Sequence, residues 1–103
     1  MSEVIKVAFG LPLVLAVPQS DQPVVELHDW RLVKTEQGST HIVGMEEGAG
    51  RVSSNVIEYD SVTQTAVTAS GRQYVLLGDC GSHPISDRVW AIFKSMHQLS
   101  EQE

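Results

Sequence analysis

The sequence predicts a mainly β protein, in which an antiparallel, twisted sheet or partly closed small barrel is covered by one C-terminal α-helix. Three observations support this prediction. Apolar residues recur with a period of two over most of the chain, turn residues separate runs of β-branched and aromatic side chains, and the period becomes helical after Gly78. The length of 103 residues corresponds to a single domain, residues 1–103, because one core typically occupies about 100 to 150 residues.

Residues 1–23 are expected to form two short strands, at 3–9 and 13–17, followed by a polar linker at 18–23. The apolar run between them is interrupted by Gly10 and Pro12. It is also shorter than the roughly 20 residues that a membrane span requires. Glu3 stands where a signal peptide carries positive charge. We therefore expect buried strands here, rather than a membrane-spanning or secretion segment.

Residues 24–78 are expected to form a β meander. In its first strand, at 24–35, the apolar residues change parity between Leu27 and Trp30, which predicts a β-bulge near residues 28–29. The strands that follow are predicted at residues 40–45, 51–59, 63–69 and 72–77, with a tight hairpin at Ser70 and Gly71 before the last strand.

Residues 79–86 are predicted to be a loop and residues 87–99 a helix, with Ser86 as the N-cap. The helix carries one apolar stripe, and both tryptophans, Trp30 and Trp90, are expected to pack it against the sheet. The stripe consists of Val89, Trp90, Ile92, Phe93, Met96 and Leu99.

The composition favours some functional classes and excludes others. Seven basic residues against 13 acidic ones give a net charge of −6, which disfavours binding to nucleic acid by bulk phosphate attraction. The 42% hydrophobic content is too high for intrinsic disorder. A single cysteine cannot form an intrachain disulfide. We therefore expect a folded protein of the cytoplasm.

The sequence does not predict an enzyme, a cofactor or a metal site. Cys80 and His83 share one loop and represent a thiol-enzyme alternative, but catalytic Cys/His pairs are usually assembled from distant segments. The glycines form no nucleotide-binding motif. The four histidines have no recognised ligand spacing; they are His28, His41, His83 and His97.

The predicted binding surface is a face of the sheet that carries Arg51, Tyr59, Arg72 and Tyr74. Arginine and tyrosine are enriched in protein-interaction hot spots, so a protein partner is the leading prediction. The same groups suit single-stranded nucleic acid, which is the alternative, and a plain solvated face with cross-strand pairs is a third possibility. The acidic turn at Glu46 and Glu47 is a second candidate contact.

Short motifs are spread over the last three quarters of the chain. They are Trp30, HIVG at 41–44, GRVSS at 50–54, Ile57, Asp60, Thr68, SGR at 70–72, Tyr74, Leu76, Gly78 and VW at 89–90. Together they resemble a pattern in small proteins of proteobacteria and their mobile elements. The resemblance implies an accessory protein of bacterial, plasmid or phage origin that acts by binding a larger host or defence component.

Edge strands and the apolar N-terminal segment also lead us to predict a homodimer.

Overall fold

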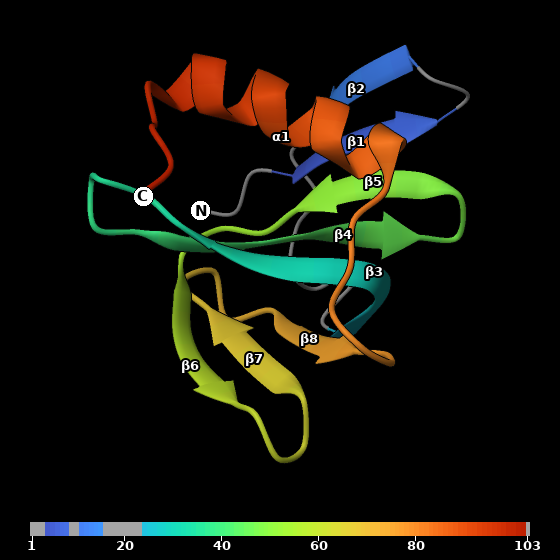
Figure 1. Ribbon diagram of the computed structural model, residues 1–103, viewed down its shortest axis with the longest axis vertical. Helices are drawn as coiled ribbons and strands as arrows, with labels where there is room; N and C mark the ends of the chain where they lie inside the picture. The colour runs from blue at the N-terminus through green and yellow to red at the C-terminus, as the bar shows by residue number, and fades with distance from the viewer. Residues whose placement is uncertain (1–3, 9–10, 16–23, 103) are drawn as a thin grey trace.

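The computed structural model describes residues 4–8, 11–15 and 24–102, which form eight strands and one helix (Figure 1). The elements are β1 (Val4–Ala8), β2 (Leu11–Leu15), β3 (Val24–Lys34), β4 (Thr40–Glu46), β5 (Ala49–Val52), β6 (Val56–Asp60), β7 (Thr65–Thr68), β8 (Gln73–Leu76) and α1 (Pro84–His97).

The strands form one sheet in the order β2-β1-β5-β4-β3-β8-β7-β6. This confirms a mainly β fold with one C-terminal helix. The two end strands, β2 and β6, do not pair with each other, so the sheet is not a closed barrel. All described pairs are antiparallel except β3 with β8, which are parallel. A meander does not predict that pair, because it joins strands that are distant in sequence.

β3 is the strand that the two halves of the sheet share. Its first part pairs with β8, and its second part pairs with β4. Between them the register with β4 shifts, and Asp29 adopts a positive φ of 48°. The predicted β-bulge is therefore confirmed, and it bends β3 so that β8, β7 and β6 fold beneath the rest of the sheet (Figure 1).

The single strand predicted at residues 51–59 is wrong, because the chain divides there into β5 and β6. Two side chains in the connection take over bonds to the backbone of β4. Ser53 Oγ accepts from the N–H of Ile42 at 2.8 Å, and Asn55 Oδ1 accepts from the N–H of Thr40 at 2.8 Å. The chain then leaves β4 and pairs β6 with β7, at the far end of the sheet.

Two hydrophobic cores lie on opposite faces of the central strands. One core, between the sheet and α1, contains Val33, Val43, Val52, Val89, Trp90 and Phe93. The other core, between the two halves of the sheet, contains Val25, Leu27, Trp30, Ile42, Ala66, Tyr74 and Leu76. Trp90 therefore packs the helix against the sheet as predicted, whereas Trp30 belongs to the opposite core. The molecule thus has three layers.

The helix begins at Pro84, three residues before its predicted start. His83, in extended conformation, is the N-cap, and its Nδ1 accepts from the N–H of Ile85 at 3.1 Å. A residue before proline favours this conformation, and proline in the first turn has no N–H to leave unsatisfied. Ser86 is buried, and its hydroxyl donates to His83 O at 3.0 Å.

The two N-terminal strands are present as an antiparallel hairpin, with Val4 opposite Leu15. The linker predicted at residues 18–23 lies outside the described residues. Among the described residues, no helix has the length and apolar character needed to cross a membrane.

Contact between helix and sheet depends on a glycine in β5. A Cβ at Gly50 would lie 2.8 Å from Val89 Cγ2 and 2.9 Å from Ser86 Cα, which is backbone. We therefore expect Gly50→Ala to lower the free energy of unfolding by about 1 to 3 kcal/mol through overpacking, measured by urea denaturation. Gly81→Ala is the control, because its nearest neighbour would lie at 3.7 Å. Equal stabilities of the two variants would contradict this close packing.

Candidate functional site

The predicted arginine and tyrosine face does not exist as an exposed surface. Arg51, Arg72 and Tyr74 each have an exposed fraction of 0%, whereas Tyr59 is 39% exposed. The expectation of four accessible side chains on one face is therefore wrong. The physical reason is the bend in β3, because it encloses the face opposite the helix between the two halves of the sheet.

Arg51 is buried inside the molecule, where it makes an ion pair and a contact with an aromatic ring. Its Nη1 donates to Glu46 Oε1 at 2.7 Å, and its guanidinium carbon lies 5.8 Å from the centroid of the Tyr74 ring. Arg51 pairs across the sheet with Gly44, which has no side chain on that face. This ion pair and the contact with the aromatic ring link β5 to β4 and to β8.

Removing the charge of Glu46 is expected to destabilise the fold, because it weakens the pairing of a fully buried guanidinium. For Glu46→Gln we expect a loss of about 2 kcal/mol in the free energy of unfolding, measured by urea denaturation. Glu47→Gln removes the same charge from the exposed neighbour and should change stability by less than about 0.5 kcal/mol. A Glu46→Gln variant as stable as its Glu47→Gln control would show that the ion pair contributes nothing.

The predicted acidic turn borders a groove. Glu46 is half-buried, while Glu47 is exposed and has a positive φ of 47°. The groove has a volume of about 330 Å³ and is lined by Val24, Glu26, His28, Glu46, Glu47 and Leu77. We call it the acidic groove. Both residues of the predicted acidic turn line this groove, but the structure does not bring them near the other predicted site residues apart from Arg51.

Tyr59 lies beside a second groove, at the opposite end of the sheet from β2. This groove, which we call the β6 groove, has a volume of about 280 Å³ and is lined by Leu32, Lys34, Thr40, Val56, Ile57, Glu58 and Tyr59. Four consecutive residues of β6 form one wall, and the ends of β3 and β4 form the other. Ile57 is 61% exposed, so the groove presents apolar surface to solvent.

One of the two backbone edges of β6 has no strand paired to it. Among the described strands, β6 pairs only with β7. The N–H of Thr68 donates to Arg72 O, so Thr68 directs its peptide groups towards the β8 side. In an antiparallel pair the direction alternates along each strand. Val56 lies opposite Thr68, and Tyr59 lies opposite Ala66, two residues before Thr68. Val56 and Tyr59 therefore direct their N–H and C=O groups away from β7.

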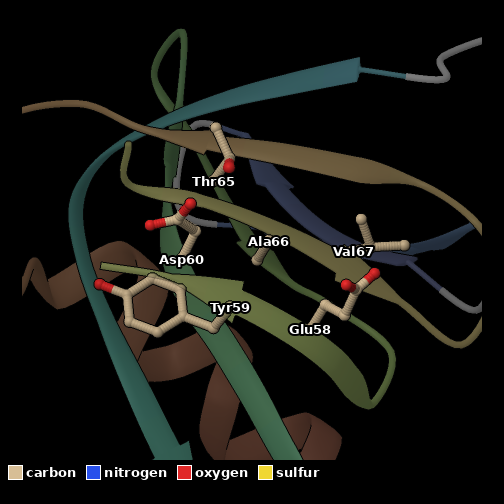
Figure 2. A pocket seen from close by; sticks show the side chains of 6 residues that line it. All are labelled: Glu58, Tyr59, Asp60, Thr65, Ala66 and Val67. Carbon is tan, nitrogen blue, oxygen red and sulfur yellow. The ribbon is translucent and has the colours of Figure 1, made fainter. Parts of the chain in front are cut away.

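The other face of β6 is acidic. Glu58 lies opposite Val67, and Asp60 lies opposite Thr65. Figure 2 shows each carboxylate beside its partner residue, and it shows the ring of Tyr59 pointing away from Glu58. A shallow pocket of about 270 Å³ follows this pair of strands. The backbone N–H groups of Val62 and Thr63 donate to the Asp60 carboxylate and lower its pKa.

His41 is buried and neutral beneath the helix. Its Nδ1 donates to Ser53 O at 2.7 Å, and its ring lies 5.1 Å from that of Phe93. Burial lowers the pKa of His41; the bond to the Ser53 carbonyl opposes this effect, and the nearby His97 adds to it. Protonating His41 therefore costs more in the folded state than in the unfolded state.

Acidification should destabilise the protein through this histidine. Because the pKa of His41 is lowered on folding, the unfolded chain binds more protons just below its own pKa of about 6.5, so stability falls as the pH drops below that value. We expect His41→Gln to reduce the stability difference between about pH 7.5 and pH 5, measured by thermal unfolding. The exposed His28→Gln control should retain the difference. An unchanged pH dependence in His41→Gln would contradict the assignment.

The loop that carries Cys80 offers no assembled catalytic pair. Cys80 is exposed, and the ring of His83 uses its Nδ1 to accept the N–H of Ile85. No hydrogen bond joins the two side chains in the described part of the chain. Within residues 4–8, 11–15 and 24–102 there is also no group of three or more metal-binding side chains.

Comparison of the chain with models of protein families, with curated proteins and with solved structures finds no match. Three main residues of the candidate site at β6 are not among the predicted binding residues: Ile57, Glu58 and Asp60. One signal in the sequence points to them, because residues 56–60 combine three apolar or aromatic side chains with two carboxylates and have no basic residue.

Proposed function

We propose that this protein is a non-enzymatic protein-interaction module that binds an extended segment of its partner as an additional strand on β6. The observation that carries the proposal is the coincidence of an unpaired strand edge with an apolar groove. Val56 and Tyr59 direct their N–H and C=O groups away from β7. Both residues, together with the exposed Ile57 between them, line the β6 groove.

Strand addition uses both features of such an edge. Main-chain hydrogen bonds to the free edge provide affinity, and pockets for alternate side chains provide specificity. Here the side chains of the added strand that face inward would contact Leu32 and Ile57, which line the same groove. Natural proteins usually protect exposed strand edges against pairing with other chains. Strand addition would turn the exposed edge of β6 into a binding site.

The single-stranded nucleic-acid alternative has no comparable support. It requires accessible guanidinium and aromatic groups, but Arg51, Arg72 and Tyr74 are enclosed. The partner implied by the resemblance, a larger bacterial component, and the predicted homodimer both stay predictions. The proposed partner is a protein chain that is extended where it binds.

The proposal can be tested by selecting short peptides from a random display library and comparing two variants at one position. Tyr59→Pro removes the outward N–H, and proline is tolerated at an edge where that N–H faces solvent. Tyr59→Leu removes the phenol but keeps the N–H. We expect selected peptides to bind Tyr59→Pro about tenfold more weakly than Tyr59→Leu, since at least one hydrogen bond is lost.

Amide hydrogen exchange gives an independent measurement on the unmodified protein. Bound peptide should slow exchange at Val56 and Tyr59, the outward-directed positions of β6. Circular dichroism of both variants controls for folding. Equal binding to folded Tyr59→Pro and Tyr59→Leu, or protection confined to another part of the sheet, would overturn strand addition at β6.

A further inference from the structure

We propose that the strand received by β6 carries basic side chains alternating with apolar ones, an inference that rests on the proposed function. The two faces of β6 differ in chemistry. Val56 and Tyr59 lie on the face that borders the core between the two halves of the sheet, since they pair with the buried Thr68 and Ala66. Glu58 and Asp60 lie on the solvent face, where they pair with Val67 and Thr65.

An added strand places its own side chains beside those of β6, alternating between the two faces. On the solvent face they stand next to the carboxylates of Glu58 and Asp60, both of which belong to exposed residues. Opposite charges on neighbouring strands stabilise pairing, and like charges destabilise it. Lysine or arginine at alternate positions of the partner therefore matches this face.

The groove face requires apolar side chains in between. Leu32 and Val56 are partly buried members of the second core and also line the β6 groove, where Ile57 is exposed. Glu58 and Lys34 are the two charged residues that line the groove, and Lys34 is the one cation. It is exposed, so its ammonium group can stay in water while its stem borders the groove. The net charge of −6 favours the approach of a basic segment.

A second copy of this chain does not fit the same edge. Antiparallel pairing of β6 with another β6 brings the Glu58 and Asp60 carboxylates of both copies together on one face, whereas parallel pairing places the carboxylates of each copy on the groove face of the other. Like charges directly opposite one another are destabilising. Charge complementarity thus favours a basic partner strand over self-association at β6.

The test uses the whole protein and three synthetic peptides: one alternates lysine and valine, one alternates glutamate and valine, and one has lysine and valine in blocks. Affinity is measured by calorimetry. We expect the alternating lysine peptide to bind at least about tenfold more tightly than either of the others. It should also protect the Tyr59 amide from exchange.

Protein variants then locate the charges that matter. The isosteric pair Glu58→Gln and Asp60→Asn, made together, should weaken binding of the alternating lysine peptide about fivefold. Asparagine retains the oxygen that accepts from Val62 and Thr63. Glu58→Lys should improve binding of the glutamate peptide. The matched control, Glu26→Gln with Glu47→Gln, removes two charges from the acidic groove and should change nothing.

Four other outcomes of these binding experiments would contradict the proposal. Equal affinity for the lysine and glutamate peptides, with Tyr59 still protected, would overturn the basic partner and leave strand addition standing. Protection of β6 by none of the peptides, including those from the display library, would overturn both. Loss of binding only in the acidic-groove control would place the basic peptide there instead. A dimer in sedimentation that Tyr59→Pro abolishes would identify a second copy as the occupant of the edge.

Discussion

The bend of β3 at Asp29 is the constraint on which the rest of the structure depends. A strand of 11 residues could have continued straight beside β4. Instead, the bulge sends its first four residues to pair in parallel with β8, and the remainder pairs with β4. This single irregularity turns one sheet into two stacked halves. Each face of the central strands thereby has a cover, with α1 on one side and β6 to β8 on the other.

The enclosed face explains why basic and aromatic residues lie inside a small acidic protein. Arg51 is fully buried, pairs with the half-buried Glu46 and faces the ring of Tyr74. Such a pair costs desolvation free energy, and the ion pair and the aromatic contact offset part of that cost. These residues are therefore part of the architecture. Exposed apolar and acidic side chains lie instead on β6, the last strand of the sheet.

β6 differs from the other strands of its half of the sheet because it has no further neighbour among the described strands. Its last four residues are exposed, whereas alternate residues of β7 and β8 are buried. A face that carries the carboxylates of Glu58 and Asp60 and a largely apolar groove, which Glu58 also borders, lie on the same short strand. The free edge between them supplies main-chain donors and acceptors, and this combination is what strand addition requires.

The sequence by itself determined the local features of this protein. Its two-residue period, its turns at Ser70 and Gly71 and its helical stripe after Gly78 specify strands, a hairpin and a helix, because each depends on neighbouring side chains. The sequence also predicted the β-bulge, because the apolar residues of β3 change parity before Trp30. The helix start was misplaced because a histidine cap before proline is a rarer signal than serine.

Only the tertiary structure decided which face is buried. Alternation assigns Arg51 and Tyr74 to one side of a strand, but it does not state whether solvent or a second layer lies beyond that side. The division of residues 51–59 into β5 and β6, and the parallel pairing of β3 with β8, are contacts between segments distant in the sequence. The free edge at Tyr59 follows from that strand order, and no local pattern encodes it.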